Sequence, residues 1–203
     1  MLFARTYDAA KAWEGGCRFV KLRNRGEKPD PDQYNPTYPE LLADLWEQGE
    51  DVMMLEHDVV PYADSLAEIA CCREPWCGFG YPGGGSITKT GTNLGCTKLS
   101  STLLAVTAEW GVSERQRQQR WDHCDARLNT WTTLHAPDVR PHRHYPDVQH
   151  RGTRHLRWAT KHRLGSDFID LDEHGEPIGV PRTPYEPLQP PEESYRARGH
   201  AAC

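Results

Sequence analysis

A short apolar run followed by two carboxylates constrains this chain more than any other stretch. Val52–Glu56 reads Val-Met-Met-Leu-Glu, and Asp58 follows after His57. Four consecutive apolar side chains predict a strand buried in a sheet. Buried carboxylates need a hydrogen-bonded turn or a cation, because an uncompensated charge is unstable in the interior. In open α/β sheets, ligands bind at the carboxyl ends of strands. Glu56 and Asp58 therefore predict either a capped strand end or a metal site.

Composition limits the class of protein. The chain has 203 residues, enough for one domain with a core, and it contains 16 Pro and 17 Gly. Its mean hydropathy is −0.77, and it has no apolar run long enough to span a membrane. The N-terminus lacks the apolar region of a secretory signal, so we expect a cytoplasmic protein without a membrane partner. Seven Cys without framework spacing predict reduced thiols.

Charge is distributed unevenly along the sequence. From Glu27 to Glu74 there are 13 acidic residues but only two Lys or Arg. From Glu114 to Arg163 there are 11 Lys or Arg against five acidic residues, and this segment is also rich in His. Such a segment predicts contact with phosphate, nucleic acid or an acidic partner, or else a solvated helix face.

Hydrophobic periodicity predicts strands alternating with helices. Residues 1–16 are compatible with a short helix. Helices are expected at Tyr38–Gln48, Tyr62–Cys72, Ser100–Ala108 and Ser113–Leu128. Strands are expected at Cys17–Leu22, Val52–Glu56, Trp76–Tyr81 and Leu94–Leu99, with an extended His-rich segment at Asp138–His150. Strand, helix, strand over the first half predicts a parallel sheet. We expect a domain over residues 1–164 and a partly disordered Pro- and Glu-rich tail over 165–203.

Two groups of residues have the chemistry of metal ligands. Cys72 and Cys77 are separated by four residues, which is a weak match to zinc spacing, and burial as small apolar side chains is the favoured interpretation. His142 and His144 alternate along an extended segment and would face one side of a strand. Together with His150 and Asp58 they predict, as an alternative function, a zinc-dependent hydrolase.

Two other stretches leave a functional and a structural interpretation open. Pro82–Ser86 is Gly-rich, but no Gly-Lys-Ser/Thr follows, so it is a hinge, a substrate-covering loop or a surface turn rather than a P-loop. Asp122 and Asp125 lie three residues apart, on one face of a helix. That pair indicates either a general base in a cleft or a solvated helix face.

The order of these stretches resembles that of small GT-A-fold glycosyltransferases, near the family 2 type and the compact versions of phages and actinobacteria. Glu56–Pro61 stands at the position of the family's DxD motif, with Glu replacing the first Asp. The resemblance covers about residues 17–155. The other stretches that carry it are Leu45–Asp51, Glu74–Phe79, Leu94–Ser100, Trp121–Leu128 and Pro141–His150.

The resemblance implies a fold and a reaction. The fold is a GT-A-like, Rossmann-related mixed sheet, mainly parallel and flanked by helices. Asp58, Glu56 and His150 would hold Mn²⁺ or Mg²⁺ on the diphosphate of a nucleotide-sugar, foremost a UDP-sugar. Asp122 or Asp125 would take the proton of the acceptor hydroxyl, and the hexosyl or pentosyl group would transfer with inversion.

The resemblance also assigns the two sides of the site. Arg5 and Thr6 would contact the nucleoside, and Trp76, Gly95 and Cys96 would line the acceptor side. Such enzymes begin with a full strand, whereas this chain offers only the stub around Leu2–Arg5. The site is therefore shortened, or it is incomplete and the protein is a non-catalytic GT-A-like binding protein. The acceptor would be a modified base of phage DNA or a virion protein, in the host cytoplasm if a phage encodes the chain.

Overall fold

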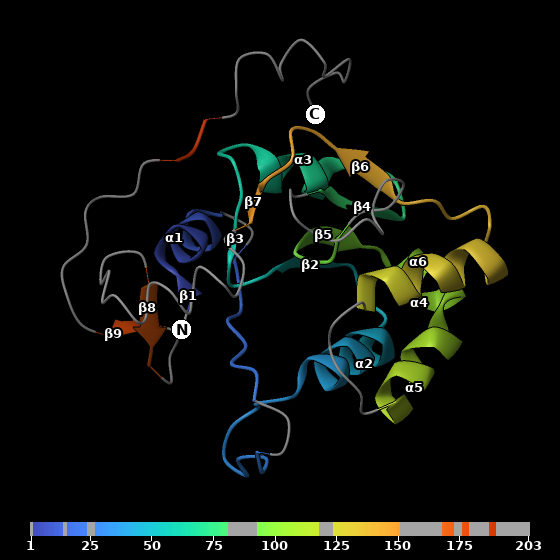
Figure 1. Cartoon of the computed structure of the whole chain (residues 1–203), viewed down its shortest axis with the longest axis horizontal. Helices are drawn as coiled ribbons and strands as arrows, with labels where there is room; N and C mark the ends of the chain where they lie inside the picture. The colour runs from blue at the N-terminus through green and yellow to red at the C-terminus, as the bar shows by residue number, and fades with distance from the viewer. Residues whose placement is uncertain are drawn as a thin grey trace.

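The structure is a computed structural model, and it describes residues 2–13, 16–23, 27–80, 93–117, 124–150, 168–172, 176–178 and 187–189. These segments form a mixed α/β fold with a central sheet between helices (Figure 1). Among the described residues, no helix combines the length and the apolar character that crossing a bilayer requires.

Four strands make the central sheet, in the order β2-β5-β4-β6. The strands are β2 (Val52–Leu55), β4 (Trp76–Phe79), β5 (Cys96–Leu99) and β6 (His142–His144). Antiparallel pairing joins β2 to β5 and β5 to β4, and only β4 and β6 are parallel. The predicted mainly parallel sheet is therefore wrong, whereas the mixed α/β class is confirmed.

The first predicted strand explains part of this difference. Cys17–Leu22 has no regular secondary structure, and Cys17 is exposed. Phe19 stacks on the ring of Tyr7, with 5.0 Å between the ring centroids, instead of pairing in a sheet. The strand–helix–strand unit is thus missing its first strand, and β2 pairs with β5, which follows it much later in the chain.

Alternation along the strands divides the core into two clusters, one on each face of the sheet. On one face Trp76, Leu99 and Met54 pack with residues from α2 (Tyr38–Gln48), α4 (Ser101–Val106), α5 (Ala108–Arg117) and α6 (Cys124–His135). On the other face Cys77 and Phe79 pack with Ile69 of α3 (Ser65–Cys71). Figure 1 shows α3 above the sheet and the larger helical layer at its lower right.

Helix α2 begins and ends where its sequence predicts. Pro39 stands in the first turn, and the Glu40 carboxylate accepts the Thr37 N–H at 2.7 Å, which satisfies a backbone donor at the helix start. Arg23 donates to the same carboxylate at 2.6 Å. Gly49 ends the helix with φ of +66°, a backbone conformation that glycine adopts without strain.

The long charged helix expected at Ser113–Leu128 is replaced by two helices. Helix α5 starts earlier, at Ala108, and α6 runs from Cys124 to His135. Each has its own buried residues, Trp110 in α5 and Leu128 in α6. Trp110 and Leu128 both pack in the core cluster that contains Trp76 and Leu99, and residues 118–123 lie outside the described residues.

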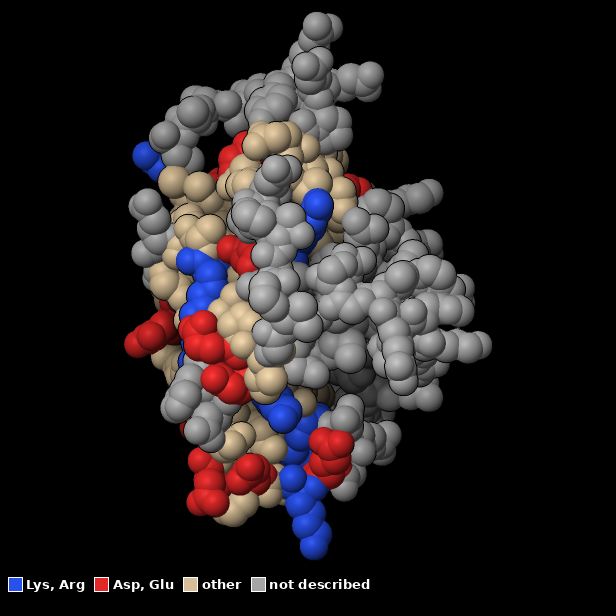
Figure 2. Space-filling model, turned by 90° about the vertical axis from the view of Figure 1, so that its left-hand side faces the viewer, with Lys and Arg blue, Asp and Glu red and all other residues tan. Residues whose placement is uncertain are grey.

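The N-terminal strand pairs with a strand from the later part of the chain. Strand β1 (Leu2–Phe3) leads into α1 (Ala4–Ala12) and pairs with β8 (Phe168–Leu171), which pairs with β9 (Pro177–Ile178). Glu176 forms an ion pair with Lys11 at 2.7 Å. The structure thus joins the N-terminus to the predicted tail. On this side of the molecule basic and acidic side chains are interleaved (Figure 2).

Candidate functional site

A hydrogen-bonded turn carries the two carboxylates that follow β2. The N–H of Glu56 donates to the Gly95 carbonyl at 2.8 Å, and the N–H of Val59 donates to the Glu56 carbonyl at 3.1 Å. These bonds fix both ends of the segment Glu56–Asp58. Asp58 is only 5% exposed, so its carboxylate is held in the protein and not in bulk water.

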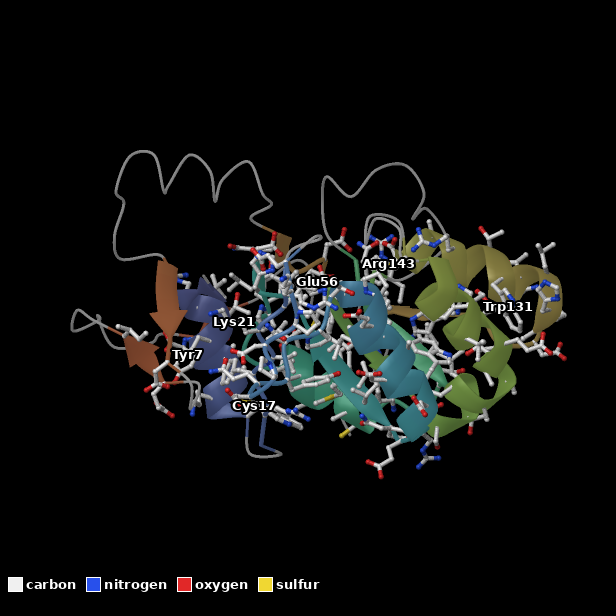
Figure 3. All side chains as sticks on the ribbon, turned by 90° about the horizontal axis from the view of Figure 1, so that it is seen from below. Tyr7, Cys17, Lys21, Glu56, Trp131 and Arg143 are labelled. Carbon is white, nitrogen blue, oxygen red and sulfur yellow. The ribbon has the colours of Figure 1, made fainter. Side chains whose placement is uncertain are left out.

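The first residue of α2 orients Glu56. The Tyr38 hydroxyl donates to Glu56 Oε1 at 2.8 Å, a hydrogen bond between α2 and the end of β2. Glu56 lies toward the upper edge of the molecule in Figure 3, on the same side as Arg143. Because α2 is fixed by its packing against α5, Tyr38 holds the Glu56 carboxylate in one position.

Three segments far apart in the sequence converge next to Asp58. Strand β3 (Val59–Val60) follows it directly and pairs antiparallel with β7 (Gln149–His150), in a register that sets Val59 opposite His150. From α1, the buried hydroxyl of Thr6 donates to the Val59 carbonyl at 2.7 Å. Paired residues in antiparallel strands have Cα atoms about 5 Å apart. Thr6 and the backbone of His150 therefore both lie beside Val59, the residue that follows Asp58.

The other residues assigned to the nucleoside and acceptor sides are placed differently. Arg5 is exposed. Trp76 and Cys96 have no exposed surface, and burial raises the pKa of the Cys96 thiol to about 12. They are core residues on opposite faces of the sheet. Gly95 is also buried, and its carbonyl accepts the hydrogen bond from the Glu56 N–H.

Of the two candidate bases, only Asp125 lies among the described residues; Asp122 and the Gly-rich segment Pro82–Ser86 lie outside them. Asp125 is half-buried in the first turn of α6, and its carboxylate accepts the Ala126 N–H at 2.7 Å. Helix α6 packs on the face of the sheet opposite to the cluster that contains Val59. The structure thus does not gather Asp125 with Asp58.

His142 and His144 meet a pair of cysteines. A ring nitrogen of His144 and the sulfurs of Cys72 and Cys77 all lie within 4.8 Å of one another. The Cys72 sulfur is also 3.4 Å from His142 Nδ1. Sequence reasoning treated the cysteines as apolar core residues and grouped these histidines with His150. The available signal was the alternation of His142 and His144, which placed them on one side of a strand but did not identify their neighbours.

Comparison of the chain with protein-family models, curated proteins and solved structures found no significant match. The function therefore has to be argued from the two groups of residues described above.

Proposed function

We propose that this chain is a metal-dependent glycosyltransferase whose donor site is built around Asp58. One observation carries the proposal: Thr6 of α1 and the backbone of His150 in β7 both lie beside Val59, which follows Asp58, although the chain separates them widely. The resemblance to GT-A-fold enzymes gives Asp58, His150 and Thr6 related roles in metal and donor binding. Their convergence supports the reading of Glu56-His57-Asp58 as a variant DxD motif.

The residues present suit a divalent cation. Asp58 places a carboxylate that is 5% exposed directly before β3, and carboxylate oxygens are ligands for Mn²⁺ and Mg²⁺. Asp58 and His150 would hold the ion, and an imidazole ligand favours Mn²⁺ over Mg²⁺, which prefers oxygen ligands and water. When bound, the ion would neutralise the charge that develops on the departing nucleoside diphosphate.

The chain's own residues would position the donor. Glu56 is fixed by Tyr38, so its carboxylate is oriented before binding and could accept a hydrogen bond from the ribose or from a metal-bound water. Thr6 fixes the backbone of β3 from the side of α1. The acceptor proton would go to Asp122 or Asp125.

Binding of the donor tests the proposal directly. The protein is heated with MnCl₂ and a panel of UDP-, GDP- and TDP-sugars, and its Tm is compared with that in MnCl₂ alone. A ligand at 100 times its Kd stabilises by about 2.7 kcal/mol, which raises the Tm by about 5–10 °C for a chain of this size. Hydrolysis of the stabilising nucleotide-sugar is then measured as the amount of nucleoside diphosphate released. Such release distinguishes an enzyme from a protein that only binds the donor.

Two isosteric variants make the test specific. Asp58→Asn keeps the shape of the side chain and is expected to abolish the thermal shift. Glu50→Gln, which changes an exposed carboxylate just before the same strand, is expected to keep it. The proposal fails if no nucleotide-sugar shifts the Tm, or if the shift persists unchanged in Asp58→Asn.

A further inference from the structure

We propose that Cys72, Cys77, His142 and His144 form a structural Zn²⁺ site, distinct from the residues around Asp58. The sulfurs of the two cysteines and a ring nitrogen of His144 lie within 4.8 Å of one another, and His142 borders the same group. The argument rests on these positions alone, independently of the proposed transferase function.

The fold explains why residues so far apart in sequence meet. Strands β4 and β6 are parallel, with Cys77 opposite His142 and Phe79 opposite His144. Helix α3 ends at Cys71, so that Cys72 is its C-terminal cap and lies over the same strands. The end of α3 thus supplies Cys72, and the pairing of β4 with β6 supplies Cys77, His142 and His144.

His144 gives the strongest indication of a ligand. It is 4% exposed, and its Nδ1 is 2.7 Å from Glu68 Oε1 of α3. Its Nε2 is buried and has no hydrogen-bond partner among the described residues. A carboxylate on one ring nitrogen fixes the tautomer that leaves the other nitrogen with a free lone pair, which is how metal-binding histidines are oriented. The buried Nε2 thus has the chemistry of a metal ligand.

The spacing agrees with tetrahedral zinc. With Zn–S of about 2.3 Å and Zn–N of about 2.0–2.1 Å, two ligand atoms on one ion are about 3.5–3.8 Å apart. The Cys72 sulfur lies 3.4 Å from His142 Nδ1, close to that separation. The rings of His142 and His144 are stacked, with centroids 4.6 Å apart. The sulfurs of Cys72 and Cys77 and a ring nitrogen of His144 lie within 4.8 Å of one another, at most about 1 Å beyond the zinc separation, and His142 borders these three residues through Cys72.

Charge favours a metal with soft ligand preferences. Two thiolates and two neutral imidazoles around Zn²⁺ give a site with no net charge, which suits burial. Binding therefore forms two Zn–S bonds, breaks two S–H bonds and releases two protons to the solvent.

Four protein ligands leave no position for a substrate, so the role of the ion is structural. It would tie the end of α3 to β6. Strand β6 continues within a few residues to β7, which carries His150. Zinc would thus stabilise the segment that holds His150 opposite Val59.

Metal analysis of protein purified without added metal or chelator tests the site. We expect about one Zn²⁺ per chain, and we expect Co²⁺ in its place to give the thiolate-to-cobalt absorption band. Cys72→Ser and His144→Gln should each lose most of the zinc and the band. Cys71→Ser is the matched control, since Cys71 is the exposed neighbour of Cys72, and it should keep both.

Each of three results would overturn the proposal. The first is wild-type protein that neither contains zinc nor takes up added Zn²⁺ or Co²⁺ with the thiolate band. The second is a Cys72–Cys77 disulfide in the unreduced protein, detected by mass spectrometry. The third is full zinc content in Cys72→Ser, a variant at a half-buried position whose fold is checked by circular dichroism. None of these measurements depends on nucleotide-sugar binding.

Discussion

Replacing Gly111 with Ala is expected to destabilise the protein, although the change favours the helix. Gly111 lies inside α5 at the contact with α2. A Cβ atom at this position would lie 2.5 Å from Cγ, 2.6 Å from Cβ and 2.7 Å from Cδ1 of Trp46. Ordinary contacts between carbon atoms are about 3.5–4.0 Å, so the added methyl group is about 1 Å too close.

The size of the effect follows from how firmly Trp46 is held. Its indole N–H donates to the Thr107 hydroxyl at 2.9 Å, and its ring packs against Trp110 with centroids 4.7 Å apart. The close approach of its Cβ means that rotating the indole would not remove the clash. Overpacking of this kind costs about 1–3 kcal/mol, and we expect the upper end, whereas Ala instead of Gly contributes about 1 kcal/mol to the helix. The net loss is therefore about 2 kcal/mol.

Thermal and urea unfolding measure this loss. For a chain of this size, 2 kcal/mol corresponds to a fall in Tm of about 4–8 °C. Val112→Ala is the control, because Val112 is in the same helix, 60% exposed, and its replacement changes helix propensity without a clash. It should be neutral or slightly stabilising. A Tm for Gly111→Ala equal to or above the wild-type value would refute the reasoning, because helix propensity would then outweigh packing.

Three further substitutions test contacts around the donor site. Thr6→Val removes the hydroxyl that donates to the buried Val59 carbonyl and should lower the free energy of unfolding by about 1–3 kcal/mol in urea titrations; an unchanged value would mean that water replaces the hydroxyl. Tyr38→Phe removes the hydrogen bond from the Tyr38 hydroxyl to the Glu56 carboxylate and should weaken donor binding about tenfold by calorimetry, about 1.4 kcal/mol, while an unaltered Kd would remove Glu56 from the site. Burial alone would raise the pKa of Glu40, but its hydrogen bonds and the nearby guanidinium hold the pKa below its usual value. The ionised Glu40 carboxylate therefore stabilises the fold above about pH 4.3, and this stabilisation is lost as the pH falls through the lower pKa of the folded state. The Tm values of Glu40→Gln and wild type should therefore converge in acid. A difference in Tm that stays constant with pH would contradict this prediction.

Local signals in the sequence were sufficient where structure depends on neighbouring residues. Thr37, Pro39 and Glu40 predict the start of α2, and Gly49 predicts its end, because capping involves atoms a few residues apart. The apolar run after Asp51 predicts β2 for the same reason. These elements appear in the structure with bounds within one residue of those expected.

Pairing between distant strands could not be read in the same way. Cys17–Leu22 has the alternation of a strand, but Phe19 finds an aromatic partner in Tyr7 and the segment joins no sheet. Strand direction depends on which segments meet, and the antiparallel pairing of β2 with β5 has no local signature.

The same distinction applies to the two candidate sites. Asp58 could be singled out from the sequence because it follows an apolar run that predicts a buried strand. The cysteine–histidine group could not, because Cys72 and Cys77 have irregular spacing for zinc and His144 is supplied by a strand far along the chain. The end of α3 and the parallel register of β4 and β6 bring them together.

The pairing of β1 with β8 has a consequence for synthesis of the protein. Leu2 lies opposite Ile169, so these two strands can pair only after residue 169 has left the ribosome. Until then α1 lacks β8, the strand that pairs with β1 at its start. The chain between β1 and β8 forms a long loop, and closing it slows this step of folding. Nascent chains that end before residue 168 should therefore expose the β3 edge that Thr6 contacts in the finished protein. Ligand binding around Asp58 would thus develop late, as one of the last parts of the fold to form.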